Sequence, residues 1–509
     1  MAFTSSCSAQ TVNDRRIRRF IPHLLVGIIA CLSIAAPQQA AGFVQGLSGQ
    51  FLVTFDWLTL AIATGAVLFF AGVALSPIGN RRLGGPEARP EFHLVTWLAM
   101  LFAAGMGAGL VFWGAAEPLM HTLTPPPDGP SAGTAAARHD ALAITQFHWS
   151  IHAWSIYAVA ALAIGMNVTP DRPPLPSAPF TQLRSRGRRL IDWIAVLAVI
   201  FGIVASLGQG ILQMGTGTQR LTGWGADHPI VIQLTLLGTL TIAYVLSASQ
   251  GLRRGIAVLS NINMAIAVGL AVFVLAAGPT ADILRTLVES LMAYGEDFIS
   301  LSTSLRAPEA AREWTRDWSL TYFLWWVAWT PFVGVFIARI SRGRTVRTFM
   351  TGVVLVPSVV TLIWFAVFGG TALSLSASGA DLGVTDFRTA QAATYAVLSH
   401  LPWPLLTQTI ALLLVFVFVL TSADSGAYVL AMFSSAREEP PVAERIFWGL
   451  VLAAVTAGAL LSAQGQNATR ALAVSGSIPL AFLLCAQAIA VLAQMIRRDD
   501  GSRQAQRRR

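Results

Sequence analysis

The stretch that decides the fold is Thr321 to Arg344, T-Y-F-L-W-W-V-A-W-T-P-F-V-G-V-F-I-A-R-I-S-R-G-R. This apolar run is long enough to cross a bilayer as a helix, and it ends in a cluster of arginines. Trp325, Trp326 and Trp329 lie near its middle, whereas interfacial tryptophans lie at the ends of a span. Pro331 removes a backbone donor, so we expect an interrupted helix beside the rings. Aromatic faces on such a helix suit a cation site, and ordinary aromatic packing is the alternative.

The composition is that of a membrane protein. Of 509 residues, 54% are hydrophobic and 12% are charged, and the mean hydropathy is +0.62. A soluble domain carries about twice that share of charged residues. The net charge of +9 is spread over short loops and the two ends, without the basic face on a soluble fold that nucleic-acid binding needs. We therefore predict an all-α polytopic membrane protein that binds no nucleic acid.

The cysteines give no sign of a metal site or of disulfides, and the first residues are compatible with two kinds of segment. Cys7, Cys31 and Cys485 show no metal-ligand spacing and predict no disulfide framework. The segment Arg15 to Ala41 is basic, then apolar, then rich in small residues. That pattern describes either a secretory signal or a first membrane helix whose N-terminus is cytoplasmic.

The hydropathy pattern predicts about twelve membrane spans. Their expected positions are 20–36, 52–76, 92–118, 140–166, 190–218, 229–248, 254–277, 318–341, 346–375, 402–434, 443–462 and 471–496. Arginines concentrate before the first span, in alternate loops and after the last span, so both termini are expected in the cytoplasm. The charged stretch 282–316 has apolar residues at helical spacing and is expected as an amphipathic helix on the membrane surface.

These spans suggest a modular organisation. The third and eighth spans both carry helix-breaking residues, and each begins a set of five spans, which is typical of inverted-repeat transporters. The repeat is inferred from spacing alone. We expect a cytoplasmic tail (1–19), two peripheral helices (20–91), a first five-helix repeat (92–278), the surface helix (279–317), a second five-helix repeat (318–496) and a short basic cytoplasmic tail (497–509).

A glycine run interrupts the third span. Gly105 and Gly109 fit a small-residue packing motif, and Gly107 adds a glycine on the other side of the helix. Such a run weakens the helix and lets a ligand approach the backbone. Freed carbonyls would bind a cation, and freed amides would bind a carboxylate.

The fourth span contributes further rings, Trp149, Trp154 and Tyr157. Together with the tryptophans of the eighth span they would enclose a cation with delocalised charge, each desolvated cation–π contact contributing ~2 kcal/mol. Such a box favours methylated onium groups, which donate no hydrogen bonds. Packing of the rings within the protein is the alternative.

The tenth span carries T-S-A-D-S-G from Thr421. Hydroxyls in a membrane helix usually bond back to the preceding turn, but Thr421 and Ser422 also offer hard oxygen ligands for sodium. Asp424 is an acid within a span and is a candidate functional residue or a helix-end contact.

Other ionisable residues in the spans give no enzyme signature. Glu117, His148 and His152 are ambiguous, since a lone histidine in a span is usually a hydrogen-bonded core residue. The chain has no paired histidine–glutamate metal motif, no nucleophile elbow and no phosphate-binding loop, so no enzyme and no cofactor beyond a coupling ion are expected.

Several of these segments together resemble the betaine/choline/carnitine transporter family. The matching segments are G-M-G-A-G-L-V-F-W-G-A-A-E-P-L from Gly105, H-A-W-S-I-Y from His152, A-S-L-G-Q-G from Ala205, W-W-V-A-W-T-P-F-V-G-V-F-I-A-R-I-S-R-G-R from Trp325, and T-S-A-D-S-G from Thr421.

The resemblance implies a fold and a site. It implies twelve helices, the last ten in two inverted five-helix repeats (a LeuT-like fold), and often a homotrimer. It implies a substrate box of Trp149, Trp154, Tyr157 and Trp326, with Trp329 on the inner path. It also implies a sodium site made by the backbones of Ala103, Met106 and Phe418 and the side chains of Thr421 and Ser422.

The sequence departs from the family pattern in three places. Where relatives with a second sodium carry threonines, this chain has Val199 and Ile203. Relatives that take choline tend to carry an acid in the glycine stretch, whereas Gly109 is neutral and favours a zwitterion. The short arginine-rich tail lacks the long regulatory helix of osmosensing relatives.

The function expected from all this is secondary uptake of a betaine-like quaternary ammonium or sulfonium zwitterion across the inner membrane, coupled to one sodium ion. The expected partners are the small onium substrate and membrane lipids. Three alternatives stay open: a gradient-independent onium exchanger, a proton-coupled choline transporter, and a membrane sensor that binds onium solutes without transporting them.

Overall fold

The protein is helical. The computed structural model describes residues 22–105, 107–168, 173–250 and 253–507, and it contains no strand in these ranges. Ten helical segments there are long and apolar enough to cross a membrane. They are Pro37–Leu75, Ala135–Gly165, Ser185–Thr222, Pro229–Ser249, Val258–Ala277, Glu309–Ile340, Val346–Ala377, Pro404–Ser435, Val442–Leu461 and Gly465–Ile496. The all-α polytopic class predicted from hydropathy is confirmed.

The first and third predicted spans differ from single long membrane helices in the structure. The first coincides with a shorter apolar helix, Pro22–Ala35. The third is divided into α3 (Leu94–Gly105) and α4 (Ala108–Leu123), and Gly107 between them has extended backbone. The glycine run thus breaks this helix, as predicted. The count of twelve spans and the repeat remain predictions.

The predicted interruption of the eighth span is wrong. α12 (Thr321–Ile340) is one continuous helix that contains Pro331. The carbonyl of Val327 would normally accept the backbone N–H of residue 331, which proline lacks. The Thr330 hydroxyl donates to that carbonyl instead, at 2.7 Å. One side chain thus satisfies the freed acceptor, and the helix continues.

A break that the sequence did not predict divides the fourth span. α5 (Ala135–Trp149) ends and α6 (Ile151–Gly165) begins on either side of Ser150, whose φ and ψ are −108° and −118°. Ser150 N–H donates to Gln146 O, and Trp154 N–H donates to Ser150 O. Trp149 is therefore the last residue of a helix, beside a kink.

The remaining helices follow the predicted pattern with shifted ends. They are α2 (Pro37–Leu75), η1 (Pro77–Asn80), α7 (Ser185–Thr222), α8 (Pro229–Gln250), α9 (Arg253–Ala277), α10 (Thr280–Thr303), α11 (Glu309–Thr315), the π-helical turn η2 (Arg316–Leu320), α13 (Val346–Ala377), η3 (Ala390–Ala392), α14 (Ala393–Ser399), α15 (Pro404–Ser435), α16 (Val442–Leu461) and α17 (Gly465–Arg507). The backbone of α17 continues to Arg507, so most of the predicted tail 497–509 is helical.

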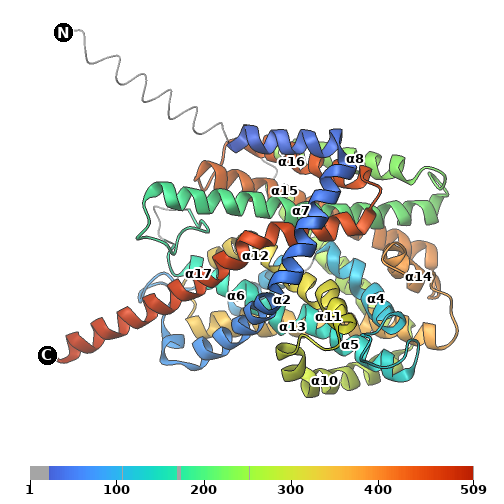
Figure 1. Ribbon diagram of the computed structural model, residues 1–509, viewed down its shortest axis with the longest axis horizontal. Helices are drawn as coiled ribbons and strands as arrows, with labels where there is room; N and C mark the ends of the chain where they lie inside the picture. Colours follow the sequence, from blue (N-terminus) through green and yellow to red (C-terminus); the bar gives the residue numbers. More distant parts are fainter. Residues whose placement is uncertain (1–21, 106, 169–172, 251–252, 508–509) are drawn as a thin grey trace, which may run out of the picture.

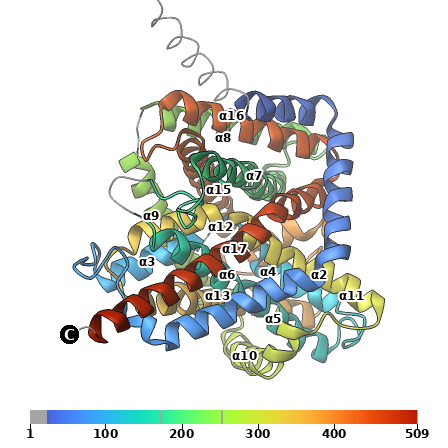
Figure 2. The same ribbon diagram turned by 60° about the vertical axis from the view of Figure 1, so that its left-hand side comes forward.

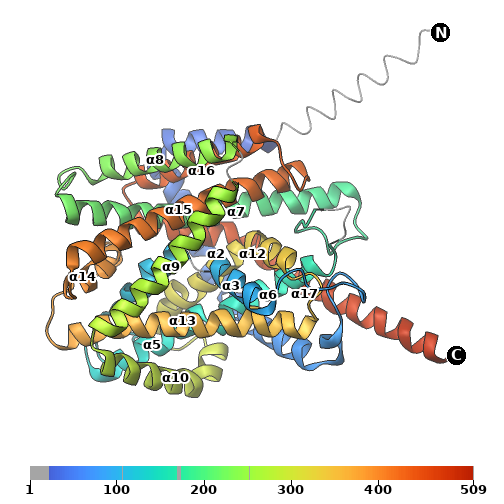
Figure 3. The same ribbon diagram turned by 180° about the vertical axis from the view of Figure 1, so that it is seen from behind.

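The helices pack around a central group. α7 lies against α15 and α17, α12 lies against α6 and α17, and α13 lies against α4 and α6. In Figure 1 the red helix α17 crosses the molecule obliquely, and Figure 2 shows α2 running down one side and bending. Seen from behind, α9 passes obliquely across α15 and α13, which it contacts (Figure 3). The helices that carry the predicted site therefore meet in the interior.

Two of the predicted arginine loops lie against each other. Leu83 N–H donates to Arg344 O at 2.9 Å, and Gly343 N–H donates to Leu83 O at 2.8 Å. The Arg344 guanidinium lies 4.9 Å from the ring centroid of Trp97. The loops after α2 and after α12 are thus on the same side of the molecule, as the arginine pattern requires.

The predicted surface helix corresponds mainly to α10. One face of α10 carries exposed apolar side chains, among them Val288, Met292 and Ile299 at 56%, 60% and 74% exposure. The other face buries Ile283 and Tyr294. This two-sided character fits a helix lying on a membrane, and its position on the membrane surface remains a prediction.

A buried ion pair ties α2 to the segment before α12. Asp56 is 1% exposed, and its carboxylate accepts from Arg312 Nε at 2.7 Å and from Arg316 Nε at 2.9 Å. It lies next to the kink of α2 at Phe55. Removing Asp56 leaves Arg316, which is 11% exposed, with only the exposed Glu309 as a charged partner, which is destabilising.

We therefore expect Asp56→Ala to lower the free energy of unfolding by about 3 kcal/mol. The measurement is the midpoint of thermal unfolding of the purified protein in detergent. Glu289→Ala is the control, because Glu289 is half exposed and lies 3.9 Å from an exposed Arg285, so its loss should change stability by less than about 1 kcal/mol. Equal midpoints for the two variants would contradict the role of Asp56.

Candidate functional site

A single chamber brings most of the predicted site residues together. Its volume is about 530 Å³ and it lies among α4, α7, α12 and α15, with Trp149 and Tyr157 from α5 and α6. The predicted residues that line it are Gly107, Gly109, Trp149, Tyr157, Trp325, Trp326, Trp329, Phe418, Thr421 and Ser422. Residues more than 300 positions apart in the chain thus face the same space.

The aromatic rings form a box at one part of the chamber. Trp149 and Trp326 lie edge to face, with their centroids 4.7 Å apart, and Tyr157 lies 6.1 Å from Trp326. Tyr322 stacks beside Trp326 at 6.2 Å. The outermost ring atoms of Trp149 lie over Gly109, where an added Cβ would come within 3.4 Å of Cη2. Electron-rich ring faces from two separate helical segments therefore border one space.

Four predicted residues lie elsewhere or cannot be placed. Trp154 is 4% exposed and packs edge-on against Tyr157 at 5.6 Å, and it is not among the described residues that line the chamber. Gly105 and Ala103 belong to α3, whose end leads to the chamber at Gly107. Met106 lies outside the described residues. Trp154 is thus a support for Tyr157 in this structure.

The hydroxyl pair on α15 reaches the chamber. The Thr421 hydroxyl donates to Val417 O at 2.9 Å and to Phe418 O at 3.1 Å, which is the local bond expected in a membrane helix. Its oxygen keeps lone pairs, and Ser422 lines the chamber beside it. Two hydroxyl oxygens and nearby backbone carbonyls are the hard oxygen donors that a sodium ion requires.

Three residues that the sequence did not single out also line the chamber: Trp113, Gln209 and Tyr322. Tyr322 lies one helical turn before Trp326 on the same face of α12, so helical spacing from the tryptophans was a usable signal. Trp113 and Gln209 lie inside quoted family segments, but nothing in the sequence separates them from packing residues. Their positions follow only from how α4 and α7 pack.

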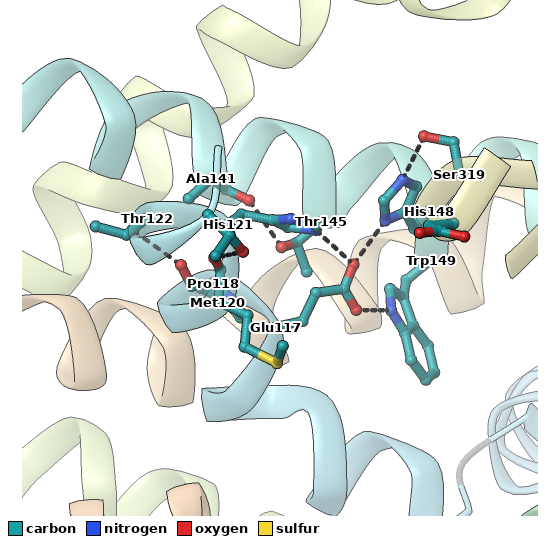
Figure 4. Close-up of polar contacts among 12 residues, drawn as sticks. Glu117, Pro118, Met120, His121, Thr122, Ala141, Thr145, His148, Trp149 and Ser319 are labelled. Atoms are coloured by element: carbon teal, nitrogen blue, oxygen red, sulfur yellow. Dashed lines mark hydrogen bonds and ion pairs between the residues drawn. The ribbon is translucent and has the colours of Figure 1, made fainter. Parts of the chain in front are cut away.

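Glu117 lies behind the box at the centre of a buried hydrogen-bond cluster (Figure 4). His148 Nδ1 lies 2.7 Å from Glu117 Oε1, and Trp149 Nε1 donates to Glu117 Oε2 at 2.6 Å. A carboxylate only accepts, so His148 donates through Nδ1, and its Nε2 lies 2.8 Å from the Ser319 hydroxyl, within hydrogen-bonding distance. The cluster links α4, α5 and the π-helical turn before α12.

The same cluster offers a set of metal-ligand groups. Glu117, His121 and His148 are fully buried, and one ligand atom of each lies within 4.8 Å of the others. Both nitrogens of His148 and both oxygens of Glu117 already have hydrogen-bond partners, so a metal ion would have to displace these bonds. The expectation that the histidines are hydrogen-bonded core residues fits His148, and it fits His152, whose Nε2 lies 3.0 Å from Ser302 Oγ.

The cluster orients two rings of the box. The indole N–H of Trp149 is bound to Glu117, and the indole N–H of Trp326 donates to the backbone carbonyl of His148 at 2.8 Å. Both polar edges are therefore engaged by the protein. The ring faces, which attract cations, are left to border the chamber.

The chamber lining includes both an exposed charged residue and buried aromatic rings. Arg339, which lines it, is 56% exposed and lies 3.3 Å from the half-exposed Glu438. Beside the box lies an aromatic plug, which we define as Trp113, Trp318, Tyr322, Phe387 and Arg470. Trp318 stacks on Phe387 at 4.6 Å, the Arg470 guanidinium lies 4.2 Å from Phe387, and Arg470 also donates to the backbone carbonyl of Asp317. The chamber therefore borders an exposed side chain at Arg339, and the aromatic plug shares Trp113 and Tyr322 with its lining.

Replacing Glu117 tests its role as a positioning residue. Glu117→Ala leaves the Trp149 indole and His148 without their acceptor, each lost bond costing about 1–3 kcal/mol. We expect a lower unfolding midpoint and at least about tenfold weaker ligand binding to the box. Glu117→Gln keeps one side-chain oxygen and should recover part of both losses. Ligand affinity that stays at the wild-type value in Glu117→Ala would show that the cluster does not orient the box.

Comparison with known proteins identifies the family. Residues 19–500 match the family model described as "BCCT, betaine/carnitine/choline family transporter". The chain is 37% identical over 460 residues to the glycine betaine transporter OpuD of Bacillus subtilis, covering 89% of this chain and 88% of that protein. It is 36% identical over 486 residues to glycine betaine transporter 1 of Vibrio parahaemolyticus (92% of each chain), and 34% identical over 479 residues to the ectoine/hydroxyectoine transporter of Virgibacillus pantothenticus (91% and 93%).

With a family model matched over nearly its whole length and helices that suit repeated membrane crossing, this chain belongs to the betaine/carnitine/choline transporter family.

Proposed function

We propose that this protein takes up a betaine-like onium zwitterion by secondary active transport. The observation that carries the proposal is the aromatic box, in which Trp149, Tyr157 and Trp326 present ring faces to one chamber. A methylated cation keeps little hydration and gains from several ring faces at once. Relatives described as transporters of glycine betaine and of ectoine support this substrate class.

The state of the chamber supports alternating access. We propose that substrate reaches the box from the side of the exposed Arg339 and that the aromatic plug separates the box from the opposite side; the exposed Arg339–Glu438 pair and the stacked Trp318 and Phe387 support this. Transport requires a second state in which the plug opens and the Arg339 side closes. We propose that the observed form is inward-facing, with both termini cytoplasmic, because the arginine loops lie on the Arg339 side and arginines concentrate on the cytoplasmic side of membrane proteins.

One sodium ion is the proposed coupling ion. Thr421 and Ser422 would supply hydroxyl oxygens, and Phe418, Ala103 and Met106 would supply backbone carbonyls. The bound ion would neutralise part of the charge of the substrate carboxylate. On α7, the positions where a second sodium site would need threonines carry Val199 and Ile203. Both side chains are apolar and 1% exposed, and Ile203 packs on Gly426. These residues offer no side-chain oxygen, so we propose a single coupling ion.

The wider organisation follows the family. We propose two inverted five-helix repeats, 92–278 and 318–496, a multi-pass position in the inner membrane, and a homotrimer in contact with membrane lipids. The two helices of 20–91 and the amphipathic α10 would lie at the periphery. Gradient-independent exchange is the closest alternative, and the apolar Val199 and Ile203 are the observation that favours it.

Uptake into proteoliposomes tests the proposal. Radiolabelled glycine betaine is supplied with an imposed sodium gradient, with an imposed proton gradient, or with unlabelled betaine inside the vesicles. We expect accumulation with the sodium gradient, whereas exchange without any gradient would support the exchanger. Binding without flux in all three conditions would identify a sensor, and the absence of both binding and flux would reject the onium site.

A variant that lacks one ring should show whether the rings bind substrate or only pack against one another. Trp326→Leu removes one cation–π contact of ~2 kcal/mol, so betaine affinity should fall about 30-fold. Trp403→Leu is the control, because Trp403 is 69% exposed and does not line the chamber. Affinity is measured by isothermal calorimetry, and unfolding midpoints show whether both variants fold. Equal affinities in the two variants would leave Trp326 as a packing residue.

The coupling ion gives a further prediction. Ser422→Ala removes a sodium ligand and should raise the sodium concentration for half-maximal uptake by about tenfold, at little cost in stability. Wild-type uptake should depend on sodium with a Hill coefficient near one, as expected for about one coupling ion. Ser425→Ala, one helical turn further along α15, is the matched control. A Hill coefficient close to two would show a second sodium site.

A further inference from the structure

One face of α10 is bonded to the broken helix that α5 and α6 form. Three buried polar side chains of α10 each meet a buried polar side chain of that helix. The distances are 2.7 Å from Ser290 Oγ to Gln146 Nε2, 3.1 Å from Tyr294 Oη to Ser150 Oγ, and 3.0 Å from Ser302 Oγ to His152 Nε2. The three α10 residues are spaced at multiples of four positions, so they lie along one side of the helix. We call these three contacts the α10 brace.

The α10 brace spans the break between α5 and α6. Gln146 lies in the last turn of α5, Ser150 is the kinked residue, and His152 lies in the first turn of α6. A kinked helix lacks part of its backbone ladder, so contacts from neighbouring elements set the angle between its two halves. Because α10 is bonded to both halves and to the residue between them, it holds this angle.

The angle at Ser150 controls the spacing of the aromatic box. Trp149 lies on one side of the kink and Tyr157 on the other, and Trp326 packs against both, with centroid distances of 4.7 Å and 6.1 Å. Tyr157 lies two turns beyond Ser150, about 10 Å along a helix that rises 1.5 Å per residue. A change of about 10° at the kink would move Tyr157 by roughly 2 Å, and a binding site loosened by about 1 Å already loses function.

We propose that Tyr294 is a positioning residue for substrate binding, which acts through Ser150 on the geometry of the aromatic box. Tyr294 is 5% exposed and is not among the described residues that line the chamber, so it acts from behind the box. Ser290 and Ser302 hold the two ends of the same brace. This inference rests on the proposed function, since it concerns how well the box fits an onium group.

Two other arrangements would explain the same contacts. Tyr294 also packs edge to face on Phe298, with centroids 5.6 Å apart, so it would only anchor α10 to the core. Alternatively, α13 would hold the kink, because Thr361 Oγ1 lies 3.2 Å from Trp149 O. That hydroxyl lies closer to Ser358 O, at 2.8 Å, so its bond to Trp149 is the weaker of the two. Binding measurements on matched variants separate these arrangements.

The first experiment compares two tyrosine-to-phenylalanine variants of the full-length protein in detergent. Tyr294→Phe removes one buried hydroxyl and keeps the ring. Tyr244→Phe is the matched control, because Tyr244 is also buried, its hydroxyl donates to Gly449 O at 2.8 Å, and it is not among the described chamber-lining residues. We expect glycine betaine affinity, measured by calorimetry, to fall about fivefold in Tyr294→Phe and less than about twofold in Tyr244→Phe. Unfolding midpoints should fall by similar amounts in both variants.

The size of the probe gives a readout that stability alone does not change. A box of fixed spacing fits tetramethylammonium better than the larger tetraethylammonium, whereas a looser kink admits both. The ratio of tetramethylammonium to tetraethylammonium affinity should fall at least about threefold in Tyr294→Phe and stay at the wild-type value in Tyr244→Phe. Ser290→Ala removes a second contact of the α10 brace and should lower the same ratio, so it tests the brace even if Tyr294→Phe fails to fold.

The outcomes separate this inference from the proposed function. No binding of any onium probe by the wild-type protein would reject the proposed function itself. Wild-type affinity and probe ratio in folded Tyr294→Phe and Ser290→Ala would overturn the role of the α10 brace and leave the onium site in place. Equal losses of affinity in Tyr294→Phe and Tyr244→Phe would make Tyr294 an anchor of α10 only. A lower probe ratio in Thr361→Val but not in Tyr294→Phe would assign the kink to α13.

Discussion

The site depends on the hydrogen bonds that hold the indole N–H groups away from the chamber. Glu117 accepts from Trp149, and the backbone of His148 accepts from Trp326. An indole whose polar edge was free would turn that edge toward any polar group in the chamber, and the ring face would no longer be available for a cation. A cation box made of tryptophans therefore needs buried acceptors behind it, and Glu117 is the acceptor that also binds His148, and through it Ser319.

Local departures from helical geometry place these groups. The break at Gly107 exposes the first turn of α4, and the kink at Ser150 sets Trp149 at the end of α5. The π-helical turn Arg316–Leu320 precedes α12 and contains Ser319. Such departures from α geometry are frequent at functional sites because they redirect side chains and free backbone groups. α12 stays regular because the Thr330 hydroxyl satisfies the carbonyl that Pro331 leaves without a donor.

The chamber presents aromatic ring faces, the kind of surface that suits the onium group of the proposed substrate. Aromatic faces act on delocalised positive charge without hydrogen bonds. The aromatic plug packs beside the box, where Arg470 lies against Phe387 and Trp318. A plug made of stacked rings and one arginine has few strong bonds to break, which would suit the barrier that the proposed alternating access requires.

The sequence by itself determined the class of fold, the positions of most membrane helices and the residue types of the box. Long apolar runs, arginine-rich loops and clustered tryptophans are local signals that carry this information. It could not determine the kink at Ser150, the continuity of α12 through Pro331, or the separation of Trp154 from the chamber, because each depends on a hydrogen bond or a ring contact that forms only in the folded helix or between helices. The positions of Tyr322 and Gln209 at the chamber and of Glu117 behind it likewise follow from contacts between helices. Only the packing of α4, α5, α7 and α12 decides which polar groups are left facing the chamber and which are satisfied within the protein.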